Sequence, residues 1–144
     1  MSASKGIERH RINHLPISRA VRAGDFIFTS ALGDHYFDPA DVRFDEEGRV
    51  VDDGSGVGPR SVEEETEGVI REVQRALAEA GATLADVVEL TAWLKDPRDF
   101  LAFNRVCAKY FSDHPPVRSV FQVGFMFDCR VEIKVTAYKP LEDG

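Results

Sequence analysis

Residues 114–140, HPPVRSVFQVGFMFDCRVEIKVTAYKP, contain two strand-like runs that decide how the fold closes. The first run opens after Pro115 and Pro116, which disfavour helix and bias the chain towards extended structure. The second run alternates apolar and polar residues, which is typical of a half-buried strand. Because residues 124–129 form only a short link, we expect the two strands to pair antiparallel.

Each run carries one charge that stands out, Arg118 in the first and Glu132 in the second. In an antiparallel pair, these two side chains can share one face of the sheet. A guanidinium holds a carboxylate through two parallel hydrogen bonds, and a nearby glutamate can hold or activate water. The alternative is that both charges are solvated on the polar faces of amphipathic strands.

Length and composition predict one ordinary globular domain, residues 1–144. Hydrophobic residues make up 43% of the chain and charged residues 30%. The net charge of −7 argues against a nucleic-acid partner, because binding to the phosphate backbone needs clustered Lys and Arg. No apolar run is long enough for a membrane span, and the N-terminus lacks the apolar core of a signal peptide. We therefore expect a cytoplasmic enzyme or binding protein.

The cysteines and histidines predict neither a disulfide framework nor a metal site. Cys107 and Cys129 are the two cysteines, and Cys107 falls on the apolar side of a predicted helix, where a buried, inert thiol is expected. His10 and His14 have the spacing of a helical metal pair, but their segment resembles a loose strand and no third ligand lies in a nearby motif.

The N-terminal third predicts a hairpin followed by a long loop. The strands ISRAV (17–21) and FIFTSA (26–31) flank a tight turn at 23–25. Residues 31–60 then contain five glycines and eight acids, and only VRF (42–44) and RVV (49–51) could form short strands there. A connection of this length in a compact domain is unusual unless it has a function or is partly disordered.

The centre of the chain predicts helix, strand and helix. Ser61 and Glu64 form a capping box that opens the first helix, and Gly81 is its natural stop. Asp96 and Pro97 suit the N-cap and first position of the second helix. The expected apolar stripes are Val62, Val69, Ile70, Val73, Ala76, Leu77 and Ala80 on the first helix, and Phe100, Phe103, Cys107, Tyr110 and Phe111 on the second. Residues 86–94 form the strand between them, with Val88, Leu90, Ala92 and Leu94 on one side and Trp93 on the other.

The predicted order is therefore β-β-loop-α-β-α-β-β, an α+β fold with a mixed sheet and both helices on one face. The strands at 26–30, 87–93 and 117–125 carry apolar groups on both sides, more than a solvated sheet face should show. Contiguous exposed apolar surface usually marks association. We expect the second face to be closed by copies of the same chain.

The chain resembles the Rid (YjgF) enamine/imine deaminases over nearly its whole length. PISRAVRAGDFIFTSA (16–31) is similar to the opening hairpin of that family, and residues 61–111 follow its helix–strand–helix centre. The two closing strands also match. The P-x-R-S motif at 116–119 is the most specific part of the resemblance.

The resemblance implies a chorismate-mutase-like fold and a homotrimer with helices outside, sheets facing the threefold axis, and clefts between subunits. Deaminases of this family hydrolyse reactive enamines and imines such as 2-aminoacrylate to 2-oxo acids and ammonia, with no metal or organic cofactor. By position, Arg118 would bind the substrate carboxylate. Ser30 and backbone groups near Val120 would frame the reacting end, and Glu132 would place the attacking water.

Several departures from the family pattern concern the substrate side. Ile17 stands where the best-understood deaminases have a tyrosine, and Ala31 replaces the usual glycine after the strand serine. The loop 31–60 is longer than in members with small substrates, and Tyr36 could supply the missing aromatic group. The alternative is that the segment around Tyr36 is a solvated acidic loop.

Three alternatives to hydrolysis of a small enamine or imine follow from the sequence. A larger substrate such as 2-aminomuconate is the first, because the long loop and the closing residues 132–140 also resemble the deaminases of that diacid. A non-catalytic trimer that binds small carboxylates is the second. Some family members have been described as ribonucleases, but an acidic chain without interleaved basic and aromatic residues gives that alternative little physical support.

Overall fold

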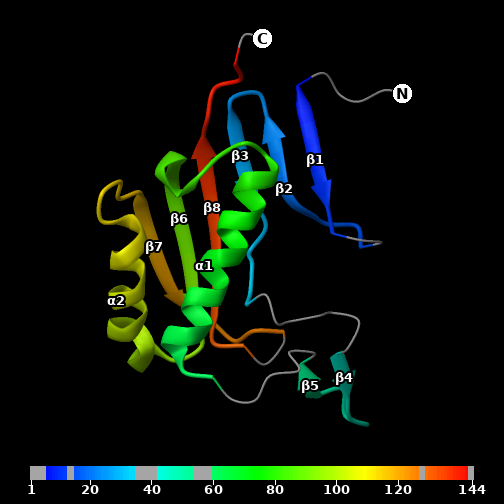
Figure 1. Ribbon diagram of the computed structural model, residues 1–144. Helices are drawn as coiled ribbons and strands as arrows, with labels where there is room; N and C mark the ends of the chain where they lie inside the picture. The colour runs from blue at the N-terminus through cyan, green and yellow to red at the C-terminus, as the bar shows by residue number, and fades with distance from the viewer. Residues whose placement is uncertain (1–5, 13–14, 35–41, 54–59, 127–128, 143–144) are drawn as a thin grey trace.

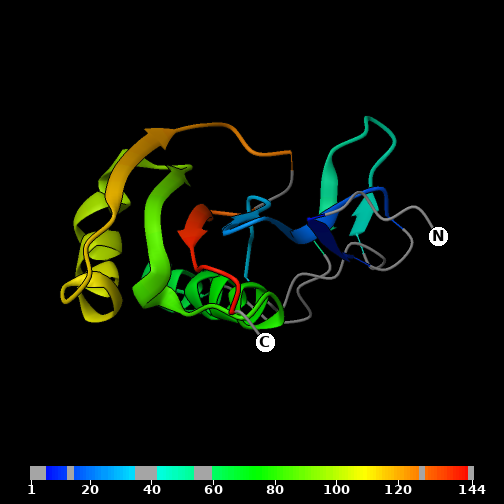
Figure 2. The same ribbon diagram turned by 90° about the horizontal axis from the view of Figure 1, so that it is seen from above.

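The computed structural model describes residues 6–12, 15–34, 42–53, 60–126 and 129–142. Within these ranges, a mixed six-stranded sheet has the order β1-β2-β3-β8-β6-β7, and α1 and α2 cover one of its faces (Figures 1 and 2). The elements are β1 (Ile7–Arg11), β2 (Ser18–Ala23), β3 (Phe26–Thr29), β4 (Val42–Phe44), β5 (Val50–Asp53), α1 (Val62–Glu79), β6 (Val87–Leu94), α2 (Phe100–Phe111), β7 (Val117–Gln122) and β8 (Val131–Tyr138). The predicted α+β class, with two helices on one face of a mixed sheet, is confirmed. No helix in the described ranges is long and apolar enough to cross a membrane.

Helix α1 forms as its local sequence predicts. The Glu64 N–H donates to Ser61 Oγ at 3.1 Å, and the Ser61 N–H donates back to Glu64 Oε1 at 3.3 Å, which completes the capping box. Gly81 ends the helix with φ +90°, a conformation that suits glycine. All seven residues of the predicted stripe are buried against the sheet.

Helix α2 begins later than predicted. Asp96 does cap a turn, because its carboxylate accepts the Arg98 N–H at 2.9 Å, but this turn is a short 3-10 helix over Pro97–Asp99. The α-helix itself starts at Phe100, which is 40% exposed, so the expected burial of Phe100 is wrong. Phe103, Cys107 and Phe111 are buried as predicted.

The predicted hairpin β2–β3 is present, but the predicted pairing of the two C-terminal strands is wrong. β8 lies between β3 and β6, and β7 pairs with β6 in parallel. The reason is the helix α2 between β6 and β7, because a crossover connection brings two strands side by side in parallel. Both ends of the link after β7 are bonded to the end of β6: the Val123 N–H donates to Leu94 O and the Lys95 N–H donates to Arg130 O, each at 3.0 Å.

The buried face of the central strands follows the predicted alternation with one exception. The apolar residues of β8 and Leu90, Ala92 and Leu94 of β6 lie under the helices. Val88 is exposed instead of buried, because the register between β6 and β8 shifts between Val87 and Glu89 and turns Val87 inward.

The opposite sheet face, which we call the open face, is uncovered in a single chain and carries large apolar side chains. Phe26 packs edge-to-face on Tyr138, with ring centroids 5.1 Å apart, and both are exposed. Phe28, Val117 and Phe121 are exposed on the same face. A face of this composition suits burial against another protein surface.

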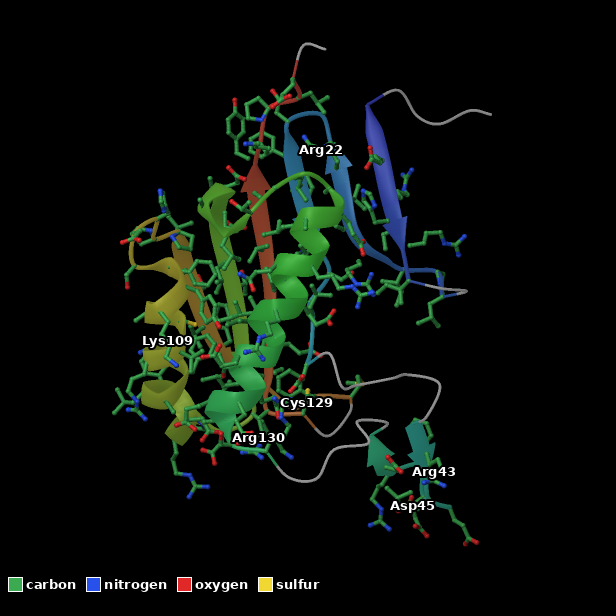
Figure 3. All side chains as sticks on the ribbon, in the orientation of Figure 1. Arg22, Arg43, Asp45, Lys109, Cys129 and Arg130 are labelled. Carbon is green, nitrogen blue, oxygen red and sulfur yellow. The ribbon has the colours of Figure 1, made fainter. Side chains whose placement is uncertain are left out.

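The predicted short strands in the long loop are present as β4 and β5, which form a separate antiparallel pair. Arg43 pairs with Asp52 across this hairpin at 2.8 Å, and Arg49 pairs with Asp45 near its turn at 2.9 Å. Figure 3 shows Arg43 and Asp45 on this hairpin, away from the helices.

Candidate active site

Arg118 lies on β7 and points to the helix side of the sheet. Its register partner on β6 is Leu90, which is buried beneath the helices. The guanidinium carbon of Arg118 lies 5.8 Å from the ring centroids of both Phe100 and Phe103 on α2, within the range of cation–π contacts. The arginine as a whole remains exposed, so its charge is open to a ligand.

A cavity of ≈ 350 Å³ opens beside Arg118, between α2 and β7. Burial raises the pKa of the Cys107 thiol in its wall to about 11, although the Arg118 charge opposes that shift. Asn104 also lines the cavity, and its buried Oδ1 has no hydrogen-bond partner among the described residues. Sequence reasoning missed Asn104. Asn104 lies three residues before Cys107 and four residues after Phe100. This spacing was the signal that the three side chains share one face of the helix.

The backbone of β7 is available at the edge of the sheet. The Val123 N–H points to β6, and the direction of backbone groups alternates along a strand. The N–H and C=O groups of Arg118 and Val120 therefore point away from β6. No strand pairs with this edge in the described part of the chain.

Glu132 lies on the opposite side of the sheet from Arg118. It pairs with Trp93 of β6, while its neighbours Val131 and Ile133 are buried under the helices. The Glu132 carboxylate therefore projects from the open face. It is half-buried, and this burial raises its pKa above the ordinary 4.5.

Ser30 and Ala31 lie next to the strand that carries Glu132. Leu32 and Ile133 exchange two backbone hydrogen bonds, at 2.9 and 3.1 Å, which hold this segment beside β8. Ala31 is exposed, and the Ser30 hydroxyl donates to the Ser18 carbonyl oxygen at 2.7 Å. Ile17 precedes that serine and is exposed. Tyr36, the remaining predicted contact, lies outside the described residues.

The predicted side chains thus fall into two groups. Arg118 and Val120 lie on the edge strand, whereas Ser30, Ala31 and Glu132 gather around the start of β8. Arg118 and Val135 of β8 are both register partners of Leu90 on β6, the strand between them. Glu132 lies three residues from Val135 along β8. Standard strand spacings therefore place the Cα atoms of Arg118 and Glu132 about 14 Å apart. The expectation that Arg118 and Glu132 share a sheet face is wrong, because it depended on direct pairing of β7 with β8.

Solved structures with the same fold and related sequences were both found for this chain. The crystal structure of a Thermotoga maritima protein, 28% identical, covers 96% of this chain and all of its own with a TM-score of 0.72. The crystal structure of a member of the YjgF protein family from Neisseria meningitidis is 24% identical and covers 94% of this chain and 97% of its own, with a TM-score of 0.73. At this identity, the similarity supports the fold alone. The molecule is therefore an α+β protein with the fold of these structures.

The family itself is shown by sequence. The model of the family Endoribonuclease L-PSP matches residues 10–139, so the chain belongs to this family. A RutC family protein of Pyrococcus abyssi is 35% identical over 125 residues, which are 86% of this chain and 87% of that protein. The chloroplastic Reactive Intermediate Deaminase A of Arabidopsis thaliana is 32% identical over 123 residues, which are 85% of this chain and 58% of that protein. The predicted resemblance to the Rid (YjgF) family is confirmed.

Proposed function

We propose that this protein hydrolyses reactive enamine or imine carboxylates to 2-oxo acids and ammonia, in sites completed between the subunits of a homotrimer. The chain's relationship to a reactive intermediate deaminase supports the reaction. The main observation behind the proposal is that the two charged groups of the candidate site are separated within one chain. Arg118 lies on an edge strand, and Glu132 lies on the open face of the same sheet.

The division matters because the two groups cannot meet within one chain. They lie on opposite faces and about 14 Å apart along the sheet. In a ring of identical subunits, each interface joins two different surface patches. The β7 edge of one subunit can then approach the open face near β8 of the next, which buries part of its apolar side chains.

Each group has a defined part in the proposed reaction. Arg118 binds the substrate carboxylate through its planar fork, and the outward backbone groups of Val120 hold the adjacent atoms. An enamine first tautomerises to the imine, which reacts in its N-protonated form. The carboxylate of Glu132 takes a proton from water as the water oxygen bonds to the imine carbon, and the electrons of the C=N π bond pass to nitrogen to give a neutral carbinolamine. Glu132 then returns that proton to the amine nitrogen, the C–N bond breaks, and the hydroxyl proton passes to the departing ammonia as the carbonyl of the 2-oxo acid forms. The imine is already electrophilic, so orientation and delivery of water are the protein's contribution.

Subunit complementation tests the divided site directly. Arg118→Ala and Glu132→Gln proteins should each lose about 100-fold or more of the wild-type activity when pure. After mixing equal amounts and exchanging subunits, about one quarter of the wild-type sites should be restored, because half of all subunits keep Arg118 and half of their neighbours keep Glu132. Activity that stays absent in verified mixed trimers would contradict the shared site.

Ammonia release from freshly generated 2-aminoacrylate, with the spontaneous rate subtracted, tests the reaction. 2-Aminomuconate should be assayed beside it, because the long loop favours a larger substrate. Light scattering should give about three times the chain mass of 16.1 kDa. Ammonia release at the spontaneous rate with both substrates would leave a trimer that only binds small carboxylates. A clean monomer at micromolar concentration would contradict the proposed site, because a single chain cannot complete it.

A further inference from the structure

A buried carboxylate on α1 holds the strand that carries Glu132. Glu65 lies in the first turns of α1, and its side chain is only 13% exposed. Its Oε2 accepts two backbone hydrogen bonds, from the Arg130 N–H at 2.6 Å and the Val131 N–H at 2.9 Å. These donors are the two residues immediately before Glu132.

The backbone at Arg130 is held from a second side as well. Its carbonyl oxygen accepts the Lys95 N–H at 3.0 Å, at the end of β6. Its guanidinium lies 3.9 Å from Glu65 Oε1 and donates to the Arg60 carbonyl oxygen. Figure 3 shows Arg130 beside the N-terminal end of α1. The start of β8 is therefore held between α1 and β6.

Arg60, just before α1, and Gly68 in its first half also hold the segment that follows Ala31. Arg60 forms an ion pair with Asp34, and both side chains are largely buried. The Asp34 carboxylate packs so closely on Gly68 that a side chain at position 68 would collide with it. Both segments on the Glu132 side of the proposed site are thus fixed to one end of one helix.

We infer that Glu65 is a positioning residue for Glu132, a role that rests on the proposed deaminase function. Its paired hydrogen bonds set the direction in which β8 begins, and that direction fixes where the Glu132 carboxylate points. A reacting group must be held within a fraction of an ångström of its productive place. What Glu65 supplies is an acceptor oxygen, so an amide oxygen should replace it.

Three variants separate this role from simple structural support. Glu65→Met keeps the size of the side chain and Glu65→Ala shortens it, and both remove the acceptor. Each should lower kcat about tenfold with little change in KM, because Arg118 binds substrate from another strand. Glu65→Gln should recover most of the loss. Glu67→Ala is the matched control: Glu67 lies two residues along α1 and accepts hydrogen bonds from Tyr110 and Lys109 of α2, so its loss should lower stability without lowering kcat.

A double-variant cycle gives the decisive readout. In a Glu132→Gln background, Glu65→Met should lower kcat no further, because the group it positions is already lost. An equal fall in both backgrounds, unchanged kcat in the Met and Ala variants, or failure of the Gln variant to recover activity would overturn the inference. If neither Met nor Ala folds, Glu65 is needed for folding and the positioning role is overturned.

A second measurement keeps this test distinct from that of the proposed function. Amide hydrogen exchange at Arg130, Val131 and Glu132 should be faster in Glu65→Met than in wild type by more than the loss of global stability explains. In Glu67→Ala, exchange at these amides should rise by no more than the loss of global stability explains. If wild type releases ammonia only at the spontaneous rate, the proposed function fails. In that case, the exchange rates still test whether Glu65 orders the start of β8. Equal rates in Glu65→Met and wild type would overturn this ordering role.

Discussion

Strands β7 and β8 carry the two charged side chains of the proposed site and differ in how firmly they are held. β8 is paired on both sides, its alternate residues are fully buried, and its first residue, Val131, donates a backbone hydrogen bond to Glu65. β7 is an edge strand whose residues are exposed apart from the half-buried Val120. The Glu132 side of the site is therefore preorganised within the chain, whereas the Arg118 side depends on what covers the edge.

This difference explains how one short chain can support a divided site. Base catalysis needs fixed geometry, and the most constrained strand of the sheet supplies it. Carboxylate binding tolerates more adjustment, because a long arginine side chain can reach its ligand from several rotamers. The cation–π contacts of Arg118 with Phe100 and Phe103 hold it loosely enough for that role.

The contrast in packing predicts the largest effect. Ile133→Ala on β8 should lower the free energy of unfolding by about 2–5 kcal/mol, because Ile133 is fully buried and its loss leaves a cavity. Val117→Ala on β7 should cost less than about 1 kcal/mol, because Val117 is 68% exposed. Chemical denaturation at a fixed protein concentration measures both. Equal losses would contradict the contrast and would mean that a neighbouring subunit buries Val117 as fully as the chain itself buries Ile133.

The second prediction concerns ligand binding on the β7 side. Arg118→Ala should weaken the binding of 2-oxobutyrate about 100-fold or more, and Arg118→Lys should recover little, because an ammonium cannot reproduce the planar fork. Calorimetric titration measures the affinity. Arg98→Ala is a suitable control, since Arg98 is an exposed arginine on the turn before α2. Unchanged affinity in Arg118→Ala would end the anchoring role.

The third prediction concerns catalysis on the β8 side. Glu132→Gln should still bind 2-oxobutyrate but lose about 100-fold in kcat, as expected for a removed general base. Burial raises the pKa of Glu132 above 4.5, and a base works only when ionised. The kcat of wild type should therefore fall as the pH drops through this raised pKa, on a limb that lies above pH 4.5. Persistence of that limb in Glu132→Gln would assign it to another group.

Features set by neighbouring residues could be predicted from the sequence. The capping box and apolar stripe of α1 depend on spacings of three and four residues, and the faces of β8 depend on simple alternation. The order of strands in the sheet depends on contacts between distant segments. The short link at 124–129 suggested a hairpin, whereas the helix between β6 and β7 was the signal for a parallel pair. The bulge that exposes Val88 has no local signal.

The site shows the same division. The motif at 116–119 and the alternation of β8 identified Arg118 and Glu132, but their relative placement required the strand order. Glu65 was missed because it stands among three acids, Glu63, Glu64 and Glu65, in the first turn of a helix. Acids there usually face solvent and offset the helix dipole. Only the packed structure shows that one of them turns inward to β8.

The smallest predicted effect tests how β8 is fixed on its other side, against β3. Thr29 is buried, and its hydroxyl oxygen accepts the Val135 N–H at 3.0 Å. Thr29→Val keeps the shape but leaves that N–H unpaired, so it should lower the free energy of unfolding by about 1–2 kcal/mol. Thr29→Ser keeps the hydroxyl and should cost less than about 1 kcal/mol. Ser119→Ala is the matched hydroxyl deletion on β7, where exposure to water should make the change nearly neutral. Urea unfolding of the three variants at one protein concentration gives the comparison. If Thr29→Val is as stable as wild type, this side-chain bond adds nothing, and the constraint on β8 comes from its backbone pairing with β3 and β6, its buried apolar face and Glu65.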